Sequence, residues 1–433
     1  MNIGEIADKT YEYLKTKDGL KGDFTISETE TNEITMKDGK FTLFRTLFDQ
    51  DVSVRVIKDS KEGSASINKC TEDAVKKAVD DAIVSAEAGD ADECFDIAPG
   101  MDPEKFKMGV LEPDIDKLME RTEELARDIA ERHKKIKLIE MFAKYVKSHS
   151  VFMNTGGTRD ESDCGYYVIY AEFAGSDGDE TTGINGTVVI MDNLDEKFID
   201  LGSIEKDLAD TENSLKPMKV TDKFEGDVIF TPQCSAQMLS FLLGNTVVDP
   251  AIIAGTSVWK DKVGEAVVSP LLTISSKPWD KRIIAHEVHT QDGFRSEDYT
   301  LIEKGVLNCL ATSLYTSNKC KVNRAANSSL TFVVDEGDTP YEDMIKSMKR
   351  GLIVGAVSCG HPGPNGEISG VAKNSFYVED GEIKGAVIET MISTNLFDMF
   401  KNVKAVSKEL LCNGSMVLPS IQCGGVTISG TEG

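Results

Sequence analysis

Residues 281–307 read KRIIAHEVHTQDGFRSEDYTLIEKGVL and contain two of the five histidines of the chain. His286 and His289 flank Glu287, an arrangement similar to half of a zinc-protease motif. In that motif the two histidines are spaced i and i+4 on a helix, so that both imidazoles reach one ion. Position i+4 here is Thr290, and the surrounding β-branched residues predict a strand instead. On a strand the two imidazoles point to opposite faces, so the sequence favours two structural histidines over a shared metal ion.

The same stretch ends in a hairpin signal that introduces a β-rich region. Turn residues between the apolar runs of 301–310 and again within 375–388 predict antiparallel pairs. Helices are expected at 341–348 and 395–400. We therefore predict that residues 225–433 form a β-rich domain, mostly an antiparallel or barrel-like sheet, with covering helices.

Two smaller units are expected before this domain. We predict that residues 1–90 form an N-terminal α+β domain with a mixed sheet and helices. Its expected elements are a first helix, a hairpin that turns at Asp38-Gly39, a strand at 51–57 and an alanine-rich helix that begins at Thr71. The acidic, proline-containing segment 90–113 reads as a linker.

Residues 113–217 predict a central α+β domain. An amphipathic pattern over 114–133 favours a long helix, strands are expected at 136–153 and 166–173, and a second helix at 203–215. The whole chain is therefore assigned to the α+β class.

Composition narrows the classes of function. The 433 residues carry a net charge of −25, which disfavours a nucleic-acid partner because an acidic surface repels phosphate. Nine scattered cysteines without a CxxC pair indicate reduced thiols and a cytoplasmic protein. No apolar run is long enough to span a bilayer, so no membrane partner is expected.

Several segments, taken in order, resemble the TldD/PmbA family. Members of this family are called modulators of DNA gyrase and are classed as metallopeptidases. The resemblance is carried by these pieces: Val54-Arg55-Val56 with Gly63 and Ala65, 151–157 (VFMNTGG), 262–265 (KVGE), Asp292-Gly293, 301–307 (LIEKGVL) and 365–370 (NGEISG). The segment 322–327 (VNRAAN) is only loosely similar to a further family segment, so the resemblance gives little support for a substrate contact at these residues.

The resemblance also implies a branch of the family. TldD-type members carry zinc on a HExxxH helix, and the matching helix here spans 234–245. Its motif positions hold Ser240, Phe241 and Asn245, and none of these side chains is a strong zinc ligand. The chain thus resembles the PmbA/TldE branch, which implies a subunit that binds no zinc or other cofactor itself. Zinc would belong to a TldD-like partner, and unfolded or short peptides would be the substrate.

Two alternatives stay open. One is a self-sufficient metal-dependent hydrolase with a divergent site at His286, Glu287 and His289, together with His361. The other is a non-catalytic regulatory homodimer, consistent with the acidic surface and the incomplete catalytic set.

Overall fold

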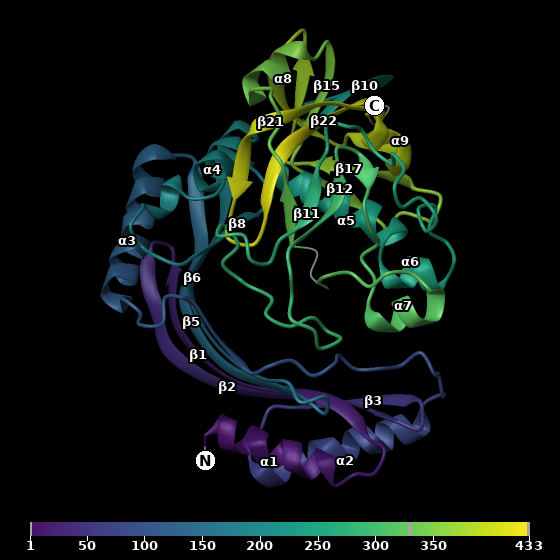
Figure 1. The fold of residues 1–433 in the computed structure, drawn as a ribbon. Coiled ribbons are helices and arrows are strands. Elements are labelled where there is room, and N and C mark those ends of the chain that lie inside the picture. Colours follow the sequence, from purple (N-terminus) through teal and green to yellow (C-terminus); the bar gives the residue numbers. More distant parts are fainter. Residues whose placement is uncertain (1, 328–330, 431–433) are drawn as a thin grey trace.

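A strongly curved sheet dominates the first half of the chain in the computed structural model, which describes residues 2–327 and 331–430. Its eight strands follow the order β3-β2-β1-β5-β6-β4, with β7 and β8 also paired to β6. Figure 1 shows this sheet wrapping around one side of the C-terminal domain. The strands are β1 (Lys21–Lys37), β2 (Lys40–Lys58), β3 (Lys61–Ile67), β4 (Glu104–Gly109), β5 (Ile136–Asn154), β6 (Arg159–Asp177), β7 (Glu180–Thr181) and β8 (Asn185–Met191).

The predicted first hairpin is confirmed, and its strands are longer than expected. Asp38 and Gly39 both adopt positive φ, as a tight turn between β1 and β2 requires. The separate strand expected at 51–57 is wrong, because these residues continue β2 without a break and pair with β1 as far as Ile57↔Lys21. The sequence hides this continuity, since polar residues interrupt the apolar alternation in the middle of β2.

Three helices cover the outer face of the sheet: α1 (Ile3–Lys15), α2 (Glu72–Ala88) and α3 (Ile115–Arg132). Phe24 and Ile26 of β1 pack with α1 and α2, whereas Ile34 and Met36 pack with α3. All four are even-numbered residues of one strand and therefore share one face. One sheet face thus carries two separate hydrophobic cores.

The segment expected as a linker contains a strand. Residues 104–109 form β4, which pairs in parallel with β6 at the edge of the sheet. Strands from both 1–90 and 113–217 belong to this one sheet. The division of residues 1–217 into two domains stays a prediction.

The second half of the chain forms a sheet of 14 strands, most of them antiparallel. Its strands are β9 (Met218–Lys219), β10 (Lys223–Phe230), β11 (Ile274–Ser276), β12 (Tyr299–Glu303), β13 (Val306–Leu307), β14 (Phe332–Val334), β15 (Arg350–Val354), β16 (Ala356–Cys359), β17 (Glu367–Lys373), β18 (Ser375–Glu379), β19 (Glu382–Ile388), β20 (Met391–Asn395), β21 (Val403–Cys412) and β22 (Val417–Ser429). The predicted α+β class with a β-rich C-terminal domain is confirmed.

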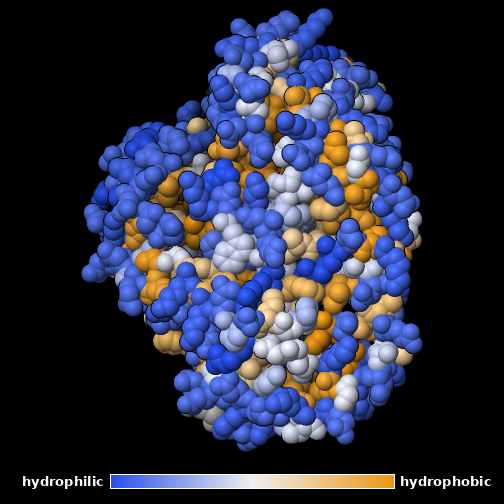
Figure 2. Space-filling model, in the orientation of Figure 1, coloured by the Kyte–Doolittle hydropathy of each residue, from blue (hydrophilic) through white to orange (hydrophobic). Residues whose placement is uncertain are grey.

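Further helices complete the architecture. They are α4 (Ile204–Asn213), α5 (Pro232–Thr246), α6 (Asp249–Ile253), α7 (Leu314–Cys320), α8 (Tyr341–Ser347), α9 (Leu396–Lys401) and a 3-10 turn at Phe198–Asp200. Helix α5 buries its apolar face, including Leu239, Leu242 and Leu243, against the C-terminal sheet. None of the helices in the described part of the chain combines the length and apolar composition needed to cross a membrane. The face in Figure 2 is mostly hydrophilic, in keeping with the excess of charged residues.

Candidate functional site

Helix α5 occupies the place where the family resemblance locates a zinc helix. Thr231 caps it by accepting a hydrogen bond from the backbone N–H of Cys234, and Pro232 sets its first turn. Ser240 is exposed, whereas Phe241 and Asn245 are half-buried. The predicted helix is therefore confirmed; Ser240 faces solvent, whereas Phe241 packs at the margin of the C-terminal core.

The side chains at these positions do not fit zinc. The Phe241 ring meets the His361 ring edge-on at 5.3 Å between centroids, and the Asn245 amide donates to the carbonyl of Phe241 at 3.1 Å. A hydroxyl, a phenyl ring and an amide supply neither the thiolate, the carboxylate nor the imidazoles that hold zinc tightly. Among residues 2–327 and 331–430, no group of three or more His, Cys, Asp or Glu side chains is arranged to hold a metal ion.

The strand predicted around His286 and His289 is wrong, because residues 277–298 form a loop with one isolated bridge between His289 and Arg295. A tight turn interrupts the chain there: Gly293 adopts a φ of 84°, and the backbone N–H of Thr290 donates to the carbonyl of Phe294 at 2.8 Å. Hydrogen bonds within this turn thus take the place of the strand-to-strand hydrogen bonds that the β-branched residues predicted.

The predicted divergent-site residues do not converge in this loop. His286 donates from Nδ1 to the carbonyl of Pro278 at 2.7 Å and stacks on Trp279. His289 is bound through Nε2 to Asp160 at 2.9 Å and stacks on Phe152 at 4.2 Å. Glu287 lies between them in sequence, and His361 lies against α5 instead. His286 is therefore bound within its own loop, His289 is bound to the curved sheet, and His361 lies against α5.

Asp160 is the centre of an ionic cluster that joins the curved sheet to the C-terminal domain. Its side chain is fully buried, and Arg295 binds it with two nitrogens at 2.7 and 2.8 Å. The backbone N–H of Glu104 donates to the same carboxylate. Burial raises the pKa of Asp160, but the hydrogen bonds from Arg295 and His289 outweigh it and hold that pKa below its usual value. Burial also lowers the pKa of His289, against the opposing effect of Asp160.

A second cluster at the same junction is centred on Asp292. Arg324 binds its carboxylate at 2.9 Å through two nitrogens, and Thr290 donates to it at 2.6 Å. Arg55 of β2 donates to the Asp292 carbonyl at 3.3 Å and also pairs with Asp23 of β1. Burial raises the pKa of Asp23 in spite of Arg55. Each carboxylate–arginine pair of this cluster lies within one half of the molecule, and the hydrogen bond from Arg55 to the Asp292 carbonyl joins the two halves.

Sequence reasoning did not place Asp160, Arg295 or Asp23 in any site. The sequence did point to three other members of the two clusters, because Arg55, Asp292 and Arg324 all lie in segments that resemble the family. A local sequence pattern cannot show that Arg55 and Asp292 lie together, because they are more than 200 positions apart in the chain.

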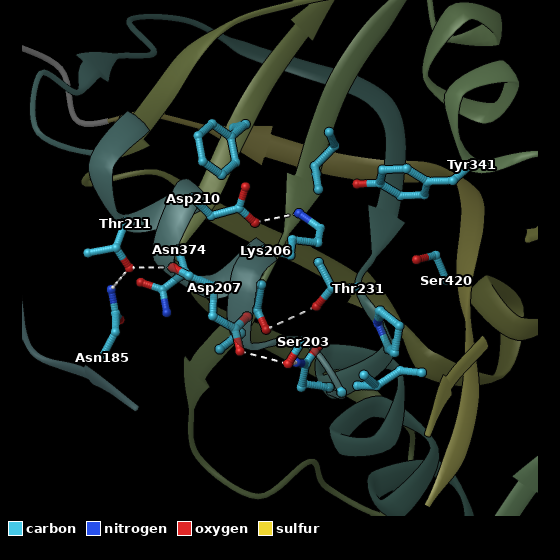
Figure 3. Close-up of a pocket in the computed structure, with 18 of the residues that line it drawn as sticks. Asn185, Ser203, Lys206, Asp207, Asp210, Thr211, Thr231, Tyr341, Asn374 and Ser420 are labelled. Atoms are coloured by element: carbon cyan, nitrogen blue, oxygen red, sulfur yellow. Dashed lines mark hydrogen bonds and ion pairs between the residues drawn. The ribbon is translucent and has the colours of Figure 1, made fainter. Parts of the chain in front are cut away.

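A cavity of about 570 Å³ lies between α4 and the C-terminal domain. Figure 3 shows Lys206, Asp207 and Asp210 of α4 on one side and Thr231, Tyr341 and Ser420 on the other. Its polar groups are partly organised: Ser203 donates to Asp207 at 2.7 Å, Asn185 donates to Thr211 at 2.8 Å, and Lys206 pairs with Asp210. The sequence did not predict this cavity, since its walls come from distant parts of the chain.

Charge and burial give the cavity an unusual carboxyl group. Burial raises the pKa of Asp207, while hydrogen bonds from Ser203 and Thr187 oppose the rise. Burial also raises the pKa of Tyr341, whose ring lies near the Lys206 ammonium at 5.9 Å. The cavity is thus lined by both charged and apolar groups, a combination found in small-molecule sites.

Two family models match separate parts of the chain. Residues 223–430 match the model described as the PmbA/TldA metallopeptidase C-terminal domain, and residues 22–86 match the PmbA/TldA metallopeptidase domain 1. A metalloprotease of Methanocaldococcus jannaschii is 24% identical over 421 residues, covering 90% of both chains. The metalloprotease PmbA homolog of Haemophilus influenzae is 23% identical, covering 96% of this chain and 94% of its own.

The fold agrees with a solved structure. TldE from Thermococcus kodakarensis superposes with a TM-score of 0.84 at 20% sequence identity, covering 99% of this chain and 100% of the other. The two family models together span more than half of the sequence. On this evidence of sequence and fold, the chain belongs to the PmbA/TldD metallopeptidase family.

Proposed function

We propose that this protein is the PmbA/TldE-like subunit of a cytoplasmic peptidase complex, without a zinc site of its own. It would assemble with a TldD-like zinc subunit that cuts unfolded or short peptides. The observation that carries the proposal is the chemistry of α5, where Ser240, Phe241 and Asn245 stand at the positions that the zinc motif fills in the other branch.

Peptide hydrolysis by this class of enzyme needs a metal that activates water and polarises the carbonyl. The partner would supply both. This chain would contribute the wall of the chamber, formed by the curved sheet and the C-terminal domain that it wraps (Figure 1). The self-sufficient hydrolase is less favoured, because His289 is engaged with Asp160 and His286 with the Pro278 carbonyl.

The test is cleavage of a fluorogenic unstructured peptide by the purified chain, by a TldD-like subunit from the same organism and by their mixture. We expect no cleavage by this chain alone and zinc-dependent cleavage by the mixture, accompanied by a stable complex in size-exclusion chromatography. Activity of the mixture should disappear on chelation and when the glutamate of the partner's zinc motif is replaced by glutamine.

A matched pair of variants controls for zinc on this chain. Ser240→Ala and Asn245→Ala should leave the zinc content and the activity of the mixture unchanged. Stoichiometric zinc on the isolated chain that is lost in either variant, or cleavage by the isolated chain after removal of contaminating protease, would contradict the proposal.

A further inference from the structure

The cavity beside α4 has an apolar floor and a polar mouth. Ile353, Phe376 and Leu411 line it and are buried, whereas the lining residues Lys206 and Glu342 are exposed to solvent. Its volume of about 570 Å³ is that of a site for a small organic molecule. Such a floor would keep the apolar body of a ligand away from water, while the mouth would admit it.

Asp207 brings a carboxylate to this cavity without a cation beside it. Among the described residues it forms no ion pair, and the adjacent Lys206 pairs with Asp210 instead. The side chains that donate to the carboxylate are the hydroxyls of Ser203, at 2.7 Å, and Thr187. Hydroxyl donors satisfy its lone pairs but do not neutralise its charge. A carboxylate withdrawn from water in this way gains from a cation that enters the cavity.

Hydrogen bonds from both halves of the molecule fix the position of this carboxylate. Gln233 of α5 donates to the Ser203 hydroxyl at 2.8 Å, and Ser203 in turn donates its only hydroxyl proton to Asp207. Behind them, Asn185 donates to Thr211 at 2.8 Å, and Thr211 donates to the backbone carbonyl of Asp207 at 2.7 Å. The carboxylate is therefore held in place before any ligand arrives, which lowers the entropic cost of binding.

Two hydroxyl groups on the wall opposite α4 lack partners. Ser420 is only 5% exposed, and its hydroxyl has no hydrogen-bond partner among the described residues, although its backbone N–H binds Ser407. The Tyr341 hydroxyl is likewise without a partner in the described part of the chain, and Figure 3 shows it directed across the cavity toward Lys206. A withdrawn hydroxyl without a partner costs free energy, which a polar group of a ligand would recover.

The charges on the lining select the kind of ligand. Lys206 is the only cation among the lining residues that the structure describes, and four carboxylates accompany it: Asp207, Asp210, Glu342 and Glu409. Because Lys206 is paired with Asp210, the charges that remain are all negative. The cavity therefore repels an anion and attracts a cation.

We propose that the cavity beside α4 is a binding site for a small organic amine. The ammonium group of the ligand pairs with Asp207, and its apolar body packs against Ile353 and Phe376. Ile204 and Leu208 of α4 belong to the core of the curved sheet, whereas the opposite wall belongs to the C-terminal domain, so the bound amine links the two halves. This inference concerns the isolated chain and does not depend on the proposed peptidase complex.

The experiment is a fluorescence titration of the full chain with dansylcadaverine, a primary amine whose emission increases in an apolar site. Two probes with the same dansyl group are the matched ligands: dansylpentylamide, which lacks the amine, and dansylaminohexanoate, which carries a carboxylate in its place. We expect dansylcadaverine to bind about tenfold or more tightly than either of them, because only the amine pairs with Asp207.

Variants of the chain locate the site. Asp207→Asn keeps an oxygen that accepts from Ser203 and should weaken dansylcadaverine binding by about tenfold or more. Ser420→Leu fills part of the cavity and should prevent binding. Glu205→Gln, at an exposed position of α4 that does not line the cavity, is the control and should bind as the unaltered chain does. Circular dichroism establishes that each variant is folded.

Three results would overturn the proposal. They are no binding of dansylcadaverine, equal affinity for the three probes, and an affinity for the amine that Asp207→Asn leaves unchanged. Equal affinity would mean that the dansyl group binds an apolar surface without help from the carboxylate. Because no peptidase activity is measured, these results are distinct from failure of the proposed function.

Discussion

At the scale of single residues, Asp207 stands out because its carboxyl group is held in the folded protein with a raised pKa, caused by burial at the wall of the α4 cavity. The folded state therefore binds more protons than the unfolded state between the ordinary carboxyl pKa of about 4 and the raised value. Across that window the free energy of unfolding falls as pH rises, and it remains lower at neutral pH.

Replacing Asp207 with asparagine should remove this loss. The side chain introduced by Asp207→Asn keeps an oxygen that accepts the Ser203 hydrogen bond but carries no charge. We expect the variant to be more stable than the unaltered protein at pH 7 and to show no gain below the ordinary carboxyl pKa of about 4. Urea unfolding at a series of pH values measures the difference. Asp210→Asn, which removes the ion pair with Lys206 on the same helix, is the control and should lose about 0.5 kcal/mol. A loss of stability in Asp207→Asn at pH 7 would contradict the assignment.

At the scale of elements, the packing of α2 on β3 depends on Gly63. A Cβ atom at this position would lie 2.3 Å from the carbonyl oxygen of Ala82 and 2.2 Å from the backbone nitrogen of Ala86. Backbone atoms of a helix have no freedom to retreat, so the helix as a whole would have to move away from the sheet.

Gly63→Ala should therefore destabilise the protein by about 3 kcal/mol, measured as a shift in the midpoint of thermal or urea unfolding. Gly244→Ala provides the matched control, because Gly244 lies within α5 and no atom within 4 Å would meet its Cβ. That variant should gain about 0.5 to 1 kcal/mol, since alanine loses less backbone entropy in a helix. Equal effects of the two substitutions would mean that α2 does not pack as closely as described.

At the scale of the whole molecule, the curved sheet and the C-terminal domain are held together by the clusters around Asp160 and Asp292. The carboxylate of Asp160 comes from β6, whereas Arg295 and His289 come from the 277–298 loop. Removing one member of a buried ion pair leaves the other charge desolvated and without compensation.

Asp160→Asn should lower the free energy of unfolding by about 3 kcal/mol at pH 7. The pKa of Asp160 is lowered in the folded protein, so its stabilising effect is fully present above the ordinary carboxyl pKa and is lost as pH falls through the lower, folded value. The deficit of the variant should accordingly shrink in acid, as measured by unfolding at pH 7 and at lower pH. Asp222→Asn, which breaks the more exposed pair with Arg350, is the control and should cost far less, because solvent screens that pair. Equal costs for the two variants would argue against a structural role for the junction.

Local patterns were sufficient for much of the fold. The periodicity of α1, α2 and α3, the Thr231–Pro232 start of α5, and the turns at Asp38-Gly39, Lys304-Gly305 and Asp380-Gly381 are all where the sequence predicts them. These features depend on residues within one or two turns of each other, so a single sequence contains the physical information that forms them. The family resemblance likewise rests on contiguous segments and is confirmed.

Tertiary structure alone decided the rest. Ile283, Ile284 and Val288 predict a strand around His286 and His289, yet residues 277–298 form a loop, because the Thr290–Phe294 turn and the contacts of His286 and His289 outweigh local β-propensity. The strand β4 was hidden in an acidic, proline-containing segment because its partner β6 lies more than 50 residues further along the chain. The junction clusters and the α4 cavity are invisible in the sequence for the same reason: each exists only where segments distant in sequence meet in space.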